Sequence, residues 1–164
     1  MKKYFFFFFI VLTVLFVVLY RFRVLPIVLE TSLISNPSPV ILEKGDTICL
    51  FDQFDFDSGG YVLYFVVIEP YPQYPKVLYT ADKECLKRLK EVFRLVYTGS
   101  DVATCESFMC LLKGDSIVLK MYMSAEYTFG LQSSQYGWLK FAQQEEFKEL
   151  LNSLTPVYSP FVRL

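Results

Sequence analysis

The sequence contains no histidine, and this absence removes whole classes of chemistry. Histidine is the commonest general base and metal ligand near neutral pH. A Ser-His-Asp triad or a Cys-His pair therefore cannot be built within this chain. The sequence also lacks a GxGxxG fingerprint and a Walker A motif, and the lone pair Gly59-Gly60 does not indicate a phosphate-binding loop. We expect no cofactor and no enzyme of these classes.

Charged residues are also scarce, at 20% of the 164 residues, whereas apolar residues make up 54%. This composition excludes a disordered chain, and the length suits one ordinary domain. The first 23 residues hold four of the 16 basic side chains and none of the 17 acidic ones, so the remainder has 12 basic and 17 acidic side chains, a net charge of −5. Nucleic-acid binding relies on clustered Lys and Arg, so we expect no nucleic-acid partner.

A long apolar run follows the short basic start of the chain. Residues 4–20 hold one polar side chain, Thr13, and no charge. As a helix this run is about 26 Å long, near the lower limit for crossing a bilayer. Arg21 and Arg23 follow it, where their side chains can snorkel to the interface. We therefore interpret residues 1–25 as a signal-anchor transmembrane helix with basic flanks, and the lipid bilayer as the partner of residues 4–20.

Cleavage of this segment and its orientation are separate questions. A signal peptide needs small residues after the apolar run, but residues 14–30 contain no Ala, Gly, Ser, Thr or Cys. The alternative, a buried helix of a soluble protein, is disfavoured because a run that is apolar on every face needs an apolar solvent. The basic charges on the two sides of the run nearly balance, with the α-amine adding one to the N-terminal side. We expect a cytoplasmic N-terminus and a domain outside, in the periplasm or extracellular space.

Four cysteines lie beyond the apolar run, and a domain outside the cytoplasm favours disulfides. Four cysteines allow three pairings, of which we favour Cys105 with Cys110 and Cys49 with Cys85. The alternative is four reduced thiols in the core. A zinc site is disfavoured, because the four-residue gap between Cys105 and Cys110 is wider than a usual knuckle and no histidine is available.

The rest of the chain divides into a tether and a domain. Residues 26–39 are predicted to form an extended tether, because residues 33–39 combine turn formers with two prolines. The domain then covers residues 40–164. Apolar runs and alternation predict its strands at residues 47–51, 61–68, 76–79, 107–112, 116–123, 127–131 and 137–141. Residues 52–60 are expected to form a long hairpin loop between the first two strands.

Two amphipathic helices are predicted within this domain. The first runs from Asp82, its N-cap, to Val96, and the second covers residues 143–154. Most strands follow one another without an intervening helix, so the sheet should be mainly antiparallel. We predict an α+β fold in which both helices cover one face of the sheet and the apolar tail, residues 157–164, packs back.

Two loops carry candidate site residues. Asp52, Asp55 and Asp57 supply three carboxylates in a glycine-containing loop, a donor set that suits calcium, although the spacing is not that of an EF-hand. Paired carboxylates would also suit a hydrolase, and a solvated acidic loop is the plain alternative. The aromatic side chains of the loops are candidate contacts with a protein partner; the alternative is that they cap the core. These aromatic residues are Phe54, Phe56, Tyr71 and Tyr74.

The segment Asp46-Thr47-Ile48-Cys49-Leu50, followed by Cys85, resembles small envelope proteins that protect bacteria against secreted toxins. The resemblance covers a minor part of the chain, and the predicted helix after Asp82 departs from it. We expect a non-enzymatic, single-pass membrane protein whose acidic domain binds a protein partner. The alternatives are an envelope immunity-type protein, which the resemblance implies, a carboxylate-dependent envelope hydrolase, and a structural subunit of a membrane complex.

Overall fold

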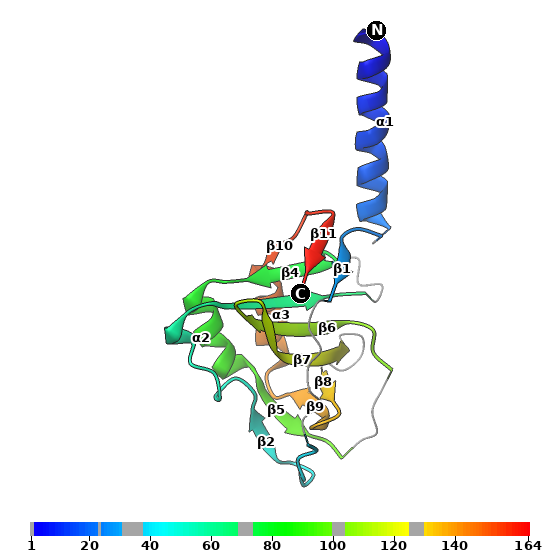
Figure 1. The fold of residues 1–164 in the computed structure, drawn as a ribbon. Coiled ribbons are helices and arrows are strands. Elements are labelled where there is room, and N and C mark those ends of the chain that lie inside the picture. Colours follow the sequence, from blue (N-terminus) through cyan, green and yellow to red (C-terminus); the bar gives the residue numbers. More distant parts are fainter. Residues whose placement is uncertain (1, 23, 31–37, 69–73, 100–103, 125–129) are drawn as a thin grey trace.

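The computed structural model describes residues 2–22, 24–30, 38–68, 74–99, 104–124 and 130–164 (Figure 1). A long N-terminal helix stands away from a mixed domain of helices and strands. The helices are α1 (Lys2–Arg21), α2 (Lys83–Val92) and α3 (Gln144–Ser153), with a short 3-10 helix η1 (Phe56–Ser58). The strands are β1 (Ile27–Leu29), β2 (Thr47–Cys49), β3 (Tyr61–Val66), β4 (Val77–Thr80), β5 (Arg94–Tyr97), β6 (Phe108–Lys113), β7 (Ser116–Ser124), β8 (Gly130–Ser133), β9 (Gly137–Phe141), β10 (Thr155–Pro156) and β11 (Phe161–Arg163).

Nine of the described strands form one antiparallel sheet in the order β10-β4-β3-β6-β7-β8-β9-β5-β2. Strands β6 to β9 are consecutive hairpins, which explains the antiparallel pairing that the sequence predicts. A separate parallel pair joins β1 to β11. The α+β class and the mainly antiparallel sheet are therefore confirmed.

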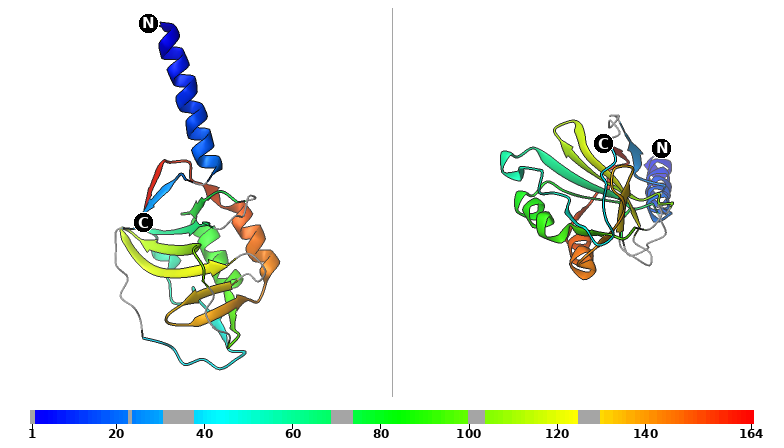
Figure 2. Two further views of the ribbon diagram at one scale, coloured as in Figure 1. Left: turned by 90° about the vertical axis from the view of Figure 1, so that its right-hand side faces the viewer. Right: turned by 90° about the horizontal axis from the view of Figure 1, so that it is seen from below.

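The two faces of the sheet are covered differently. Helices α2 and α3 lie on the same face (Figure 2), and their apolar side chains share one core cluster with the strands. On the opposite face a smaller cluster forms, where Val162 and Leu164 pack against residues of β3, β4 and β6 such as Val66 and Val77. The β1–β11 pair therefore covers the face that the helices leave open.

The first predicted helix ends four residues earlier than expected, and this changes the sheet. Asp82 caps α2 through a hydrogen bond from the Cys85 N–H to its carboxylate at 2.7 Å, as predicted. The helix stops at Val92, and residues 94–97 become β5, placed between β2 and β9. Strand pairing on both sides buries Leu95 completely, which outweighs the helical spacing of the apolar residues.

The prediction of a hairpin between the first two strands is wrong. Strand β2 lies at one edge of the sheet beside β5, while β3 lies between β4 and β6. Residues 52–60 therefore cross from one part of the sheet to another and contain η1, which the Asp55 carboxylate caps. The reason is that β2 finds its partner in β5, a strand that the helical pattern concealed.

The segment expected to be a tether is in part a strand. Residues 27–29 pair in parallel with residues 161–163, which also shows how the apolar tail packs back. Further along, the Val40 N–H donates to the Gln135 carbonyl at 2.8 Å. Residues 31–37 of the expected tether lie outside the described part of the chain.

Gly130 is a position where no side chain fits. A β-carbon built there would lie 2.6 Å from Trp138 Cζ2 and 2.7 Å from the carbonyl oxygen of Leu139, both on the neighbouring strand. We expect Gly130→Ala to destabilise the domain by about 1–3 kcal/mol, because the backbone oxygen cannot move aside. The measurement is the denaturant midpoint, with Ser124→Ala, opposite Gly130 on β7, as the tolerated control. Equal midpoints for the two variants would contradict this prediction.

Candidate membrane-proximal site

Helix α1 has the length and composition to cross a membrane, which an N-terminal signal sequence also has. Its apolar stretch, Tyr4–Arg21, is 18 residues long; no residue in it is buried, and only Leu19 and Tyr20, next to the domain, are half-buried. The one polar side chain in its centre, Thr13, donates its hydroxyl to the Phe9 carbonyl at 2.9 Å. The centre of the helix therefore presents an apolar surface on every side, with the Thr13 hydroxyl satisfied internally.

The end of α1 is fixed to the domain by short connections. Lys76 Nζ donates to the Val24 carbonyl at 3.3 Å, and Leu25 and Pro26 are buried. Next, the Ile27 N–H donates to the Pro160 carbonyl at 2.9 Å, which starts the β1–β11 pair. The domain therefore begins within a few residues of the helix end.

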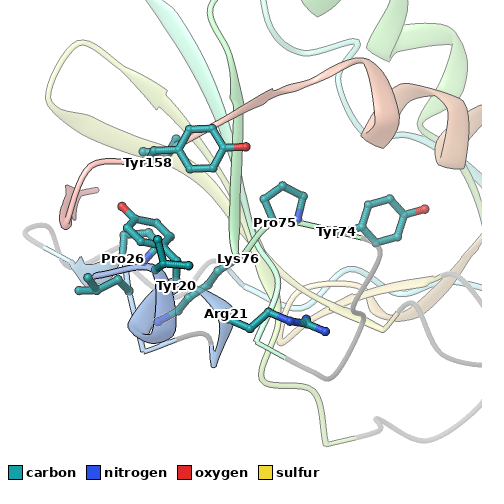
Figure 3. Close-up of a pocket in the computed structure, with 10 residues that line it drawn as sticks. Tyr20, Arg21, Pro26, Tyr74, Pro75, Lys76 and Tyr158 are labelled. Carbon is teal, nitrogen blue, oxygen red and sulfur yellow. The ribbon is translucent and has the colours of Figure 1, made fainter. Parts of the chain in front are cut away.

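A groove of about 370 Å³ lies where α1 meets the domain (Figure 3). We call it the foot groove. Three segments build it: the last turn of α1 with the residues that follow, the residues that lead into β4, and the chain after β10. Its lining residues are Val17, Tyr20, Arg21, Leu25, Pro26, Tyr74, Pro75, Lys76, Val157 and Tyr158. Two of them are cationic and none is acidic, although the chain beyond Arg23 has a net charge of −5.

Tyrosine side chains form one wall of the foot groove. The rings of Tyr20 and Tyr158 lie 6.0 Å apart between centroids, and Phe16 packs edge-on against Tyr20 at 4.9 Å. The hydroxyl oxygen of Tyr20 is buried and makes no hydrogen bond to any described residue. Tyr158 itself is 67% exposed, so the ring that forms this side of the groove faces mainly solvent.

Exposed apolar side chains surround the end of α1. We call them the apolar collar: Phe22, Val24, Ile27, Tyr158 and Phe161. They come from the helix end, from β1 and from the chain leading into β11, which lie beside the foot of α1 in both side views (Figures 1 and 2). Such a concentration of exposed apolar groups is typical of a surface that another apolar phase covers.

The acidic loop has a structural role. Asp57 makes ion pairs with Lys83 at 2.9 Å and with Lys87 at 3.0 Å, which join η1 to α2. These contacts lower the pKa of Asp57: the hydrogen bond from Lys83 has the largest effect, and the one from Lys87 comes next. Asp55 accepts the Asp57 N–H, while Asp52 is exposed. Among the described residues, no three Cys, Asp or Glu side chains are placed to hold a metal ion.

The candidate aromatic contacts are mostly turned inward. Phe56 and Tyr74 are buried, and Phe54 is partly buried against the same core. These three rings therefore pack against the core of the domain, and Tyr71 lies outside the described residues. Sequence reasoning missed Lys76 and Tyr158 as site residues. No local pattern marks them, because the foot groove is assembled from segments distant in sequence.

All four cysteines lie in the described part of the chain, and none of them forms a disulfide. The predicted pair of Cys105 and Cys110 assumed a short closed loop, but the extended strand β6 starts at Phe108 and carries Cys110 away. Cys49 lies on the edge strand β2, and Cys85 lies in the first turn of α2. The prediction of two disulfides is wrong in this structure.

Burial raises the pKa of the Cys110 thiol to about 12, from an ordinary value of 9.0. The thiol is therefore neutral in the folded protein at pH 8, and we expect it to resist alkylation until the domain unfolds. Between pH 9 and about 12 the thiolate forms only in the unfolded chain, so Cys110 lowers the free energy of unfolding as the pH rises through that window. Alkylation at pH 8 with peptide mass mapping checks the expected protection of the Cys110 thiol. Rapid modification of Cys110 in the folded chain would contradict that protection.

Comparison with protein-family models, with curated proteins and with solved structures finds no significant match to this chain.

Proposed function

We propose that this chain is a single-pass membrane protein with a cytoplasmic N-terminus and an acidic, non-enzymatic domain outside that binds a protein partner. The exposed apolar surface of α1, continuous with a packed joint at residues 24–30, carries the proposal. Cleavage after α1 would separate Tyr20 from Tyr158 and dismantle the foot groove. The joint therefore favours a retained anchor over a removed signal sequence.

The proposed orientation rests on charge. The α-amine, Lys2 and Lys3 precede the apolar run, and Arg21 and Arg23 follow it. The excess of one positive charge on the N-terminal side favours a cytoplasmic N-terminus.

The orientation is tested with Asn152→Cys, which places a thiol on the exposed end of α3. We expect a membrane-impermeant maleimide to label this variant in intact cells above the level of the wild-type chain. Labelling that appears only after the cells are permeabilised would place the domain in the cytoplasm and overturn the orientation.

The partner surface that we propose lies at the end of the domain opposite α1 (Figure 1). Ile41 is 97% exposed there and stands beside the exposed Val40. The same end holds β2, the last strand in the sheet order, whose outer edge offers backbone groups to an added strand. An exposed apolar anchor at the same end of the domain as an open strand edge suits an extended segment of another protein.

This surface is tested by photo-crosslinking in cells that express the full chain. A photoreactive amino acid at Ile41 is expected to give a discrete adduct with a second protein, because this side chain is 97% exposed at the end of the domain that holds β2. The same amino acid at Asn152, on α3, is the control. An absence of adducts at Ile41, or identical adducts at both positions, would overturn the proposed partner surface.

A further inference from the structure

The foot groove lies at the level of the lipid headgroups if α1 spans the membrane as proposed. The apolar stretch of α1 ends at Arg21, and a charged residue in this position marks the interface. Tyr20 and Tyr158 add the amphipathic rings that favour the same depth. The apolar collar surrounds this level on the domain side. The groove therefore opens where phosphate groups are most concentrated.

The charges of the groove select an anion. Arg21 and Lys76 line it, and its other lining residues are uncharged. Lys76 Nζ is held beside the groove by its hydrogen bond to the Val24 carbonyl at 3.3 Å. Figure 3 shows the Arg21 side chain extending along the groove below Pro75, toward Tyr74. Charge-assisted hydrogen bonds from these two groups are the strong interactions that fix a phosphate.

The Tyr20 hydroxyl gives an independent indication of a ligand. It is buried without a hydrogen bond to any described residue, which is costly for a polar group. The ring of Tyr158 lies 6.0 Å away between centroids and is 67% exposed, so the Tyr20 hydroxyl lies close to the outer surface of the protein. An oxygen atom of a lipid headgroup would accept the hydrogen bond that Tyr20 lacks.

From these observations we infer that the foot groove binds the phosphate headgroup of an anionic glycerophospholipid. Arg21 and Lys76 contact the phosphate, Tyr20 donates to another oxygen of the headgroup, and Val17 and Leu25 contact the first carbons of the acyl chains. The volume of about 370 Å³ suits a headgroup and its glycerol. A headgroup without a cationic amine is favoured, because two protein cations already surround the site. This inference rests on the proposed membrane anchor.

The test is native mass spectrometry of the full chain in a neutral detergent, titrated with phosphatidylglycerol and, separately, with phosphatidylcholine. We expect a one-to-one complex with phosphatidylglycerol that is weakened about tenfold or more in the double variant Arg21→Gln, Lys76→Gln, because two charge-assisted contacts are lost. Tyr20→Phe is expected to weaken the complex by a smaller factor. The matched control, Arg88→Gln with Lys140→Gln, removes two cations from α2 and β9 and should bind as the wild type does.

Three results would overturn the inference: equal weakening in the groove and control variants, equal binding of the two lipids, or full competition by free glycerol phosphate at lipid concentration. The last result would show a phosphate site that does not select lipid. Alkaline extraction of the same membranes separates this inference from the proposed anchor. Protein that resists extraction but binds no lipid contradicts the groove alone, whereas protein that is released contradicts the anchor.

Discussion

Replacing Phe93 with alanine is expected to destabilise the domain by about 3–5 kcal/mol. The Phe93 ring is fully buried where the chain leaves α2 and enters β5. Its centroid lies 4.6 Å from that of Phe51, 5.2 Å from that of Phe141 and 5.7 Å from that of Phe147. The ring therefore joins the chain after β2 to β9 and α3. Truncation leaves a cavity among rings that cannot close it, since Phe141 and Phe147 already stack on each other at 4.0 Å.

This loss is a large share of the roughly 5–15 kcal/mol that a domain has in total, so the variant should be partly unfolded at 37 °C. The measurement is denaturant unfolding of the full chain in detergent, followed by the fluorescence of Trp138, the single tryptophan. Phe161→Ala is the matched control, because this phenylalanine is exposed in β11, and it should cost less than about 1 kcal/mol. A similar loss in both variants would show that Phe93 is not central to the core.

Patterns that are local in sequence predicted their elements well. The apolar run became α1, the capped amphipathic segment became α2, and the alternation of residues 116–123 became β7. In each case the side chains that decide the element lie within a few residues of one another. The side of the sheet that the two helices share also followed from their single apolar stripes.

Pairing between distant segments could not be predicted in the same way. The strand β5 has the apolar spacing of a helix, and only its two neighbours, β2 and β9, make it extended. Residues 27–29 pair with residues 161–163, near the other end of the chain, so no short window of sequence contains both. The foot groove depends on that pairing. This dependence explains why no local sequence pattern identified Lys76 and Tyr158 as site residues.

Two arginines in the centre of α1 are expected to release the chain from the membrane. Leu12 and Leu15 lie near the middle of the apolar stretch and are exposed on one side of the helix. Each arginine there costs about 2.5–3.5 kcal/mol on insertion, while each central Leu or Phe contributes only about 0.3–0.6 kcal/mol in favour of it. One arginine leaves the long apolar run able to insert. Two arginines offset most of the favourable free energy of inserting this run. Leu12→Arg with Leu15→Arg should therefore move most of the protein into the alkaline extract.

The position of the arginines, and not their number, decides this result if α1 spans a bilayer. Phe5→Arg with Phe22→Arg adds the same two charges at the ends of the helix, where the side chains reach the interface, so this protein should stay in the membrane. A helix that only lies on the membrane surface has no central region to protect, and both variants would then extract alike. Equal extraction of the two variants, measured by immunoblot after carbonate treatment, would therefore contradict the proposed anchor.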